Sequence, residues 1–398
     1  MEFHFDPEDE AFRQEVRAFI KAKLDPELAE RMAKGFYPTR TEMAWWMGVL
    51  AEKGWVAPHW PVEHGGPGWS PLRRLIFEEE CILADAPPRK LGNLVNIGPI
   101  LYTYGTPEQK RRYLRGTMTG EIFWCQGFSE PNAGSDLASL RTRAVRDGDH
   151  YVVTGQKIWT SGAHESDMMY ALVRTGSEGR PQAGITFLLL DMKSPGVTVR
   201  PLITINESHM VNEVFLDGVR VPVENRVGEE GKGWGLAGSL LAGERAFSAD
   251  LPQTMRDMKE LKRVAARERK GARPIIENPL FRAKLARLEV NIHALHFAML
   301  RVLSANDEHE LSAVAIIKLR GSELRQQVAE LLVEALGDYG LAFYPDPFMP
   351  GYQDEPVPPG PEYASGAANN FLFRRAFTIV GGSNEIQRDI IAKRVLSL

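Results

Sequence analysis

The hydrophobic pattern of this sequence changes twice along the chain, and these two changes constrain the fold more than any other feature. Up to about residue 121, apolar residues recur at helical spacing. From 122 to 235, short runs of β-branched and aromatic residues alternate with turn residues such as Asp147-Gly148, a hairpin signal. Long helical patterns return from 236 to 398. The order predicts a mostly helical α+β protein with an N-terminal helical domain (1–121), a central β-barrel or β-sandwich domain (122–235) and a C-terminal helical bundle (236–398).

Prolines mark several of the expected boundaries. Pro71 and Pro107 each follow a Ser or Thr directly, which is the arrangement of an N-cap before a proline at the first helical position. The patterns predict helices over about 41–53, 71–84 and 107–118. Pro252 is expected to kink or divide the first helix of the C-terminal part. The stretch 344–366 is rich in Pro and Gly and is expected to be a long loop.

Composition and charge narrow the classes of function. The net charge of -4 gives no basic excess for nucleic acid or an anionic membrane. The longest apolar run is far shorter than the roughly 20 residues that span a bilayer, and the acidic N-terminus lacks the apolar segment of a signal peptide. Cys81 and Cys125 fit neither a disulfide framework nor a zinc site. We therefore expect a cytoplasmic protein without a membrane span or a nucleic-acid partner.

Two motifs point to other functions, and their context argues against both. "GWGLAG" (233–238) matches the G-x-G-x-x-G of dinucleotide-binding folds, but a long helical pattern follows where a second strand should end. We expect these glycines to end a loop and begin a helix. His293 and His296 lie three apart on a predicted helix without an obvious third ligand, so packing or surface roles are expected rather than a metal site.

Two polar segments of the central part are candidates for ligand binding. "GFSEPNAGSD" (127–136) offers hydroxyls and unpaired backbone N–H groups after a strand, although by itself it also reads as an ordinary solvated loop. In "GQKIWTSGA" (155–163), Trp159 adjoins Thr160 and Ser161. A lone tryptophan is usually a core residue, but one beside hydroxyls can stack on an aromatic cofactor whose edge the hydroxyls bond.

Together with "GGSNEIQR" (381–388), these segments resemble the acyl-CoA dehydrogenase family. They match its motifs in order and spacing over essentially the whole chain, and "NEVFLDGVRVP" and "GEEGKGW" are further family-like stretches. The resemblance implies an N-terminal helical domain, a central β-domain and a C-terminal four-helix bundle. It also implies a homotetramer with one FAD per subunit.

The resemblance further implies where the cofactor and the substrate bind. In the family, the backbone around Gln126 to Ser129 and the residue matching Ser129 hold the isoalloxazine. The match to Trp159 lies along the flavin, and the match to Ser161 bonds near its N5 atom. Ser135 matches a serine that contacts the acyl-CoA.

A neighbouring subunit completes the FAD site in the family. It supplies an arginine to the diphosphate from a stretch resembling R-x-x-F-G-R-P. Here "RKGARP" is one residue shorter and lacks the phenylalanine; we choose Arg269, with Arg273 as the alternative. "EALGDYGL" matches the segment that contacts the partner's adenosine half, which places Glu334 and Gly337 there.

The position of the catalytic base is the main departure. Ser383 and Glu385 match positions that touch FAD near the last helix, but where many members carry the glutamate base this chain has Gly381. Some branches, including the isovaleryl- and long-chain-type enzymes, place the base on the first helix of the bundle, directly before an arginine. "LAGERAF" puts Glu244 there as the base, with Arg245 as a substrate contact. The alternative is a solvated Glu-Arg pair on a helix surface.

The resemblance implies an enzyme of lipid metabolism. Glu244 would remove the α-proton of an acyl-CoA, flavin N5 would take the β-hydride, and an electron-transferring flavoprotein would accept the electrons from the enzyme that forms the 2,3-enoyl-CoA. Ala242 stands where some members have an aspartate for the pantetheine arm, and Ala242 and Gly243 together favour a bulky acyl group. Two alternatives remain open: a related flavin oxidase or monooxygenase, and a non-catalytic subunit that pairs with an active homologue.

Overall fold

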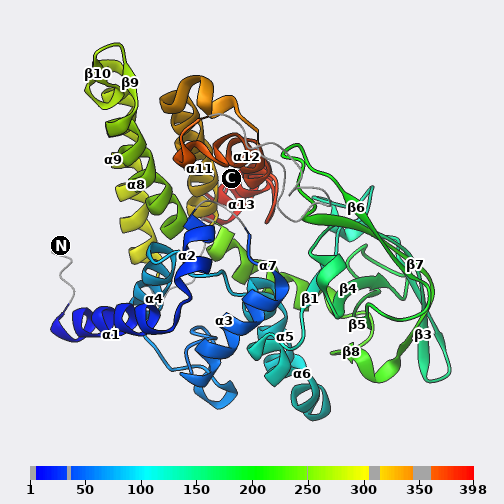
Figure 1. Cartoon of the computed structure of the whole chain (residues 1–398). Coiled ribbons are helices and arrows are strands. Elements are labelled where there is room, and N and C mark those ends of the chain that lie inside the picture. Colours follow the sequence, from blue (N-terminus) through cyan, green and yellow to red (C-terminus); the bar gives the residue numbers. More distant parts are fainter. Residues whose placement is uncertain (1–5, 34–36, 249, 304–313, 344–359) are drawn as a thin grey trace.

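The computed structural model describes residues 6–33, 37–248, 250–303, 314–343 and 360–398, without the side chains of residues 242–248 and 303 (Figure 1). Its elements follow the predicted helical, β, helical order, which confirms the mostly helical α+β class. Residues 344–359 of the loop predicted over 344–366 lie outside the described part of the chain.

Helices form the N-terminal part, and side-chain caps fix where they begin. They are α1 (Pro7–Lys23), α2 (Pro26–Ala33), α3 (Arg40–Glu52), α4 (Pro71–Leu83), the π-helix η2 (Gly92–Ile97), α5 (Gly98–Tyr104) and α6 (Pro107–Thr119). The Ser70 hydroxyl caps α4, and Thr106 forms a capping box at the start of α6. Each cap precedes a proline, so both predicted starts are confirmed. These helices enclose a core that includes Trp46, Trp60 and Phe77.

The central strands form one eight-stranded sheet. They are β1 (Trp124–Gly127), β2 (Arg143–Asp147), β3 (His150–Ser161), β4 (Met168–Arg174), β5 (Ile185–Asp191), β6 (Val197–Leu202), β7 (Val211–Pro222) and β8 (Arg226–Val227). Their order is β6-β7-β3-β2-β4-β5-β8, and β1 pairs in parallel with β4. Alternate residues of β4 contribute to two separate cores, one with Tyr151 and Val214 and one with Phe128 and Leu236. The strand is therefore a continuous apolar run rather than an alternating one.

Long helices form the C-terminal part. They are α7 (Gly233–Ser248), α8 (Leu251–Arg267), α9 (Pro279–Leu303), α11 (Val314–Leu336), α12 (Ala367–Phe373) and α13 (Asn384–Ile390), with the short strands β9 (Arg269–Lys270) and β10 (Arg273–Pro274) between α8 and α9. Pro252 falls in the first turn of α8 and thus separates it from α7, as predicted. No helix in the described part of the chain is long and apolar enough to cross a membrane.

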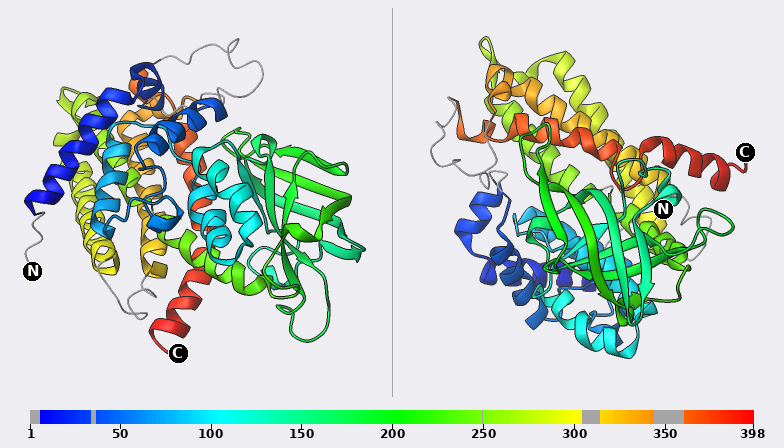
Figure 2. Two further views of the ribbon diagram at one scale, coloured as in Figure 1. Left: turned by 90° about the horizontal axis from the view of Figure 1, so that it is seen from below. Right: turned by 90° about the vertical axis from the view of Figure 1, so that its right-hand side faces the viewer.

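Helix α7 connects the sheet to the bundle. It begins at Gly233, so the "GWGLAG" glycines open a helix as expected. Leu236 and Leu240 pack with Phe128 and Tyr170 of the central part, and the helix also contacts α11. Figures 1 and 2 show the sheet on one side of the molecule and the helices of both other parts on the opposite side. Helix α7 therefore lies where the three parts meet.

Candidate active site

A one-residue bulge near the end of β3 determines how Trp159 is presented. The three steps from Lys157 to Thr160 on β3 match two steps on β7, from Val214 to Asn212. Trp159 has φ of 60°, a left-handed conformation that is rare for a bulky residue. Its side chain is nevertheless 60% exposed. Strain held at an exposed aromatic residue, of order 1–3 kcal/mol, indicates a functional position.

The bulge is attached to the polar loop that follows β1. The backbone N–H of Ile158 donates a hydrogen bond to the Ser129 carbonyl oxygen over 3.0 Å. Beneath both segments, the buried Lys157 Nζ donates to the Glu130 carboxylate at 2.8 Å and to the Phe128 carbonyl at 3.2 Å. The two segments that the sequence singled out are therefore one connected structure.

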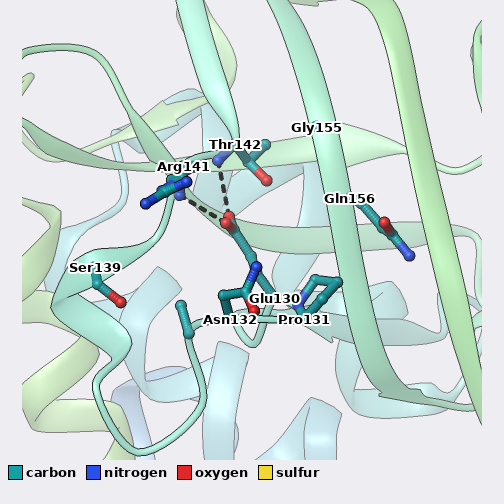
Figure 3. A pocket seen from close by; sticks show the side chains of 9 residues that line it. Glu130, Pro131, Asn132, Ser139, Arg141, Thr142, Gly155 and Gln156 are labelled. Atoms are coloured by element: carbon teal, nitrogen blue, oxygen red, sulfur yellow. Dashed lines mark hydrogen bonds between the residues drawn. The ribbon is translucent and has the colours of Figure 1, made fainter.

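Glu130 is a structural anion rather than a base. Its two carboxylate oxygens accept hydrogen bonds from the backbone N–H groups of Arg141 at 2.6 Å and Thr142 at 2.9 Å (Figure 3). Burial alone would raise the pKa of Glu130, but Lys157 and the hydrogen bonds outweigh it and lower that pKa. Burial also lowers the pKa of Lys157, to about 8, against the opposing effect of Glu130. Since its pKa is lowered and its carboxylate already accepts from Lys157 and two backbone N–H groups, Glu130 is poorly suited to take a proton.

The same loop borders a cavity of about 220 Å³, shown in Figure 3. Its lining comes from the loop and from β3: Glu130, Pro131, Asn132, Ala133, Ser139, Arg141, Thr142, Gly155 and Gln156. The volume is below the roughly 300–1,000 Å³ typical of small-molecule sites. Trp159 and Ser135 are not part of the lining, so this cavity is distinct from the predicted flavin and acyl sites.

Gln126 is held by two neighbours at the end of β1. Its Oε1 accepts hydrogen bonds from Asn96 Nδ2 at 3.1 Å and from the Tyr170 hydroxyl at 3.0 Å. Asn96 lies in the π-helix η2, so this helix orients the strand end. Along the following loop, Ser129 is half-buried and Ser135 is exposed.

These residues fit a flat aromatic group with a polar edge. The Trp159 ring supplies an aromatic face, and the exposed Ser161 lies two residues further on the same strand. Between them, the Thr160 hydroxyl oxygen is buried without a hydrogen-bond partner among the described residues. An isoalloxazine needs this combination of a stacking surface and unused hydrogen-bonding atoms.

A glycine turn precedes the last helix. Gly381 and Gly382 have φ of 67° and 85°, left-handed values that favour glycine. The buried Lys318 of α11 donates to the Gly382 carbonyl at 2.8 Å and so fixes the turn. Ser383 then caps α13, and Glu385 is exposed in its first turn.

The residues predicted to serve a neighbouring chain lie away from the sheet. Arg269 and Arg273 occupy β9 and β10 at the tip of the α8–α9 hairpin, which Figure 1 shows far from the central strands. Arg269 is exposed, and within the described part of the chain it donates to the backbone carbonyl of Ala272 at 2.8 Å. Glu334 pairs with Lys284 of α9 at 2.7 Å, and Gly337 follows α11 with φ of 58°. The single chain does not bring these residues to Trp159.

The predicted base lies on the expected helix. Glu244 and Arg245 fall within α7, eleven and twelve residues after its start at Gly233, but their side chains lie outside the described part of the chain. The backbone thus agrees with the predicted position, and the roles of the two side chains stay predictions.

The buried lysines are the main features that sequence reasoning missed. Lys157 has the same strand parity as Tyr151 and Val153, which are buried, so the alternation of β3 could have placed it inside. Lys318 interrupts the apolar run "AVAIIKL", a weaker signal of the same kind.

Comparison with known proteins agrees along the whole chain. Residues 6–121, 125–219 and 231–396 match the acyl-CoA dehydrogenase N-terminal, middle and C-terminal domains, respectively. The acyl-CoA dehydrogenase IpdE1 of Mycobacterium tuberculosis is 36% identical over 396 residues, which cover 98% of this chain and 97% of that protein.

Solved structures with the same fold include two that are named for two components. The Tcur3481-Tcur3483 steroid ACAD superposes with a TM-score of 0.85 at 30% identity and covers 100% of this chain and 99% of its own. The ChsE4-ChsE5 complex from Mycobacterium tuberculosis has a TM-score of 0.82 at 31% identity, with 100% and 99% coverage. With three matching domains and near full-length relatives, the chain belongs to the acyl-CoA dehydrogenase family, whose members are FAD flavoproteins that dehydrogenate acyl-CoA thioesters.

Proposed function

We propose that this chain dehydrogenates a bulky, ring-bearing acyl-CoA thioester between its α- and β-carbons, with Glu244 as the base. The observation that carries the proposal is the strained, exposed Trp159 on a bulge that is bonded to the Ser129 loop. Ring-bearing substrates are favoured because one structure at 30% identity is named a steroid ACAD. The small residues Ala242 and Gly243 before the base favour the same class.

Each residue has a proposed task. Gln126, Ser129, Trp159 and Ser161 hold the flavin ring, Ser383 and Glu385 contact FAD from the last helix, and Ser135 and Arg245 contact the acyl-CoA. The chemistry that FAD supplies when bound is acceptance of a hydride from the β-carbon.

Glu244 removes the proton from the α-carbon. A glutamate has an ordinary pKa near 4.3, and burial beside an apolar substrate would raise it towards the working pH. Gly381 has no side chain for this task, and Glu130 is held by Lys157 and two backbone N–H groups, so α7 is the best source of the base.

The complete FAD site is proposed to need a second chain. The exposed Arg269, or Arg273 in its place, would reach the partner's FAD diphosphate, while Glu334 and Gly337 contact the adenosine half. We propose a homotetramer for this reason. A pairing with a different homologue is the second candidate, because two similar structures are named for two components.

An electron-transferring flavoprotein is the proposed electron acceptor, with an oxidase or monooxygenase reaction as the alternative. The three domains are proposed to divide at 121/122 and 235/236. A cytoplasmic location completes the proposal and fits the two buried free cysteines.

The test is anaerobic mixing of the FAD-loaded protein with straight, branched and ring-bearing acyl-CoA thioesters while flavin absorbance is followed. Bleaching by ring-bearing thioesters is the expected result. A protein that takes up no FAD, or a flavin that no thioester bleaches, would contradict the proposal. Peroxide formed under air, compared with reduction of a dye acceptor, separates the oxidase alternative.

A further inference from the structure

Arg325 is a buried cation in the middle of α11. Only 3% of its side chain is exposed, and its guanidinium carbon lies 3.8 Å from the centroid of the Phe377 ring. Phe377 belongs to the 3₁₀-helix η10 (Arg374–Thr378), which leads into the turn at Gly381. A second buried arginine, Arg374, lies 5.4 Å from the same ring.

The hydrogen bonding of Arg325 is incomplete. Its Nη2 lies 3.1 Å from Asp250 Oδ2, and Asp250 is 36% exposed. Its Nε is buried without a hydrogen-bond partner among the described residues. Burial, reinforced by the charge of Arg374, lowers the pKa of Arg325 to about 10. A guanidinium carries five N–H donors, and leaving a buried donor unused costs about 1–3 kcal/mol.

A purely structural role explains Arg325 poorly. Lys318, the buried cation two turns earlier on α11, has both the Gly382 carbonyl and Asn384 Oδ1 as acceptors, at 2.8 and 3.2 Å. Among the described residues, Arg325 has no comparable set of acceptors. Since a buried ion pair stabilises a fold no better than apolar residues of similar volume do, an under-bonded arginine at this position needs another reason.

The position of Arg325 supplies that reason. Asp250 comes six residues after Glu244, just past the end of α7, and Phe377 comes four residues before Gly381. Helix α11 contacts both α7 and η10. Arg325 therefore contacts Asp250, which follows the helix that carries the proposed base, and Phe377, which precedes the turn before α13.

We infer that Arg325 is a specificity-determining residue that donates hydrogen bonds to an oxygen atom on the part of the acyl group remote from the thioester. This inference rests on the proposed function and narrows its substrate class to acyl groups with a remote ketone or carboxylate. The planar guanidinium suits both acceptors.

The experiment uses the FAD-loaded protein and three thioesters built on the same cyclohexyl ring. They are 3-cyclohexylpropanoyl-CoA and its two derivatives that carry a ketone or a carboxylate at C4 of the ring. The rate and the half-saturating concentration of anaerobic flavin reduction are measured for the parent, Arg325→Met, Arg325→Lys and the control Arg320→Met. Arg320 lies on the same helix but is 44% exposed and pairs with Glu323. Thermal unfolding of each variant shows whether it is folded.

The parent is expected to prefer one or both oxygenated thioesters at least about tenfold in kcat/KM, as a charged hydrogen bond provides. Arg325→Met should abolish this preference and leave kcat/KM for the cyclohexyl thioester within about threefold of the parent value. Arg325→Lys should keep part of the preference, and Arg320→Met should keep all of it. If the parent prefers the ketone thioester alone, or the carboxylate thioester alone, that result identifies the oxygen-bearing group that Arg325 binds. A parent without preference, or a folded Arg325→Met that loses all three thioesters equally, would overturn the inference. If no thioester reduces the flavin of the parent, the proposed function fails first and the inference with it.

Discussion

Ile158 donates its backbone N–H to the carbonyl oxygen of Ser129 over 3.0 Å, and this bond joins two segments that lie almost thirty residues apart in sequence. One segment presents the strained Trp159 and the other the polar loop after β1. The buried Lys157–Glu130 pair lies next to this junction, so a change at either residue should disturb the predicted flavin site without removing a residue that is proposed to contact FAD.

The base is tested by Glu244→Gln. This variant keeps the size of the side chain, so FAD should bind normally, but flavin reduction by a good thioester should fall about 10²- to 10⁴-fold. Stopped-flow absorbance measures the rate, and Glu229→Gln, an exposed glutamate before the same helix, is the control. Reduction at the parent rate in Glu244→Gln would show that Glu244 is only a helix-surface carboxylate.

Adding Gly381→Glu to that variant should restore part of the rate, because family members act from this position. Gly381 has φ of 67°, so a glutamate there carries a backbone strain of order 1 kcal/mol or more. We therefore expect partial rescue with a lower unfolding temperature. A double variant as slow as Glu244→Gln would argue that the turn does not face the α-carbon.

The variant Trp159→Asn tests the backbone strain at this position separately from the contribution of the ring to FAD binding. Asparagine accepts left-handed backbone more readily than tryptophan, so the unfolding temperature of the FAD-free protein should stay the same or rise. Loss of the ring should weaken FAD binding about 2- to 10-fold, as measured by fluorescence titration. Trp45→Asn, at a tryptophan that is 42% exposed on α3, should leave FAD affinity unchanged. Equal FAD affinity in Trp159→Asn would remove Trp159 from the cofactor site.

Glu130→Gln tests the support beneath the junction. It leaves the buried Lys157 ammonium without its anion, which should lower the free energy of unfolding by about 3–5 kcal/mol in urea titrations. Adding Lys157→Met should recover much of that loss, since no buried charge then remains. The control Glu213→Gln changes a part-buried carboxylate that accepts a hydrogen bond from the Gln156 side chain across the strands. If Glu130→Gln is no less stable than this control, the pair does not support the loop.

Lys318→Met should change the pH dependence of stability. Burial lowers the pKa of Lys318 to about 8 from its ordinary 10.5. Below pH 8 both folded and unfolded chains hold the proton; between pH 8 and 10.5 only the unfolded chain does, so this residue makes stability rise with pH. The free energy of unfolding of the parent relative to Lys318→Met should therefore increase from pH 8 to 10. The control Lys259→Met, at an exposed lysine, should show no such increase. A difference in the free energy of unfolding between the parent and Lys318→Met that does not change with pH would contradict the lowered pKa of Lys318.

Mixing two inactive variants tests whether neighbouring chains share a site. Glu244→Gln chains keep Arg269, and Arg269→Gln chains keep Glu244. If each site combines both residues from different chains, random reassociation should make about a quarter of the sites complete. Activity after co-refolding, compared with each variant refolded alone, measures this fraction. No gain would mean that Arg269 does not serve a neighbour, and the same experiment with Arg273→Gln then tests the alternative.

The sequence predicted those features that local chemistry determines. The starts of α4 and α6 follow from Ser70 and Thr106 with their prolines. Helix α3 begins one residue earlier than predicted, because Thr39 and Glu42 form a capping box that periodicity alone did not reveal. The left-handed Trp159 could not be predicted, since the bulge depends on the register between β3 and β7.

The burial of Arg325 in the C-terminal bundle is another feature that the sequence could not predict. Nothing local distinguishes it from exposed arginines such as Arg320, because its burial depends on how α7, η10 and α11 pack together. The motif residues of the candidate site were found only through the family resemblance. Composition and periodicity by themselves left the Ser129 loop as an ordinary loop and Trp159 as a core residue.

The exposure of Trp159 also gives the protein an optical signal of its own. Trp46 is 0% exposed and Trp60 and Trp124 are each 1% exposed, so their emission is that of indole in apolar surroundings. Trp159, at 60% exposure, meets water and should emit at longer wavelength, as should Trp45 at 42% exposure, whose emission the Trp45→Asn variant removes. Flavins absorb light in the range where tryptophan emits. A flavin that lies along the Trp159 ring would therefore quench the emission of Trp159 more strongly than that of the other tryptophans. Uptake and release of the cofactor can then be followed by the red edge of the intrinsic fluorescence, without a label.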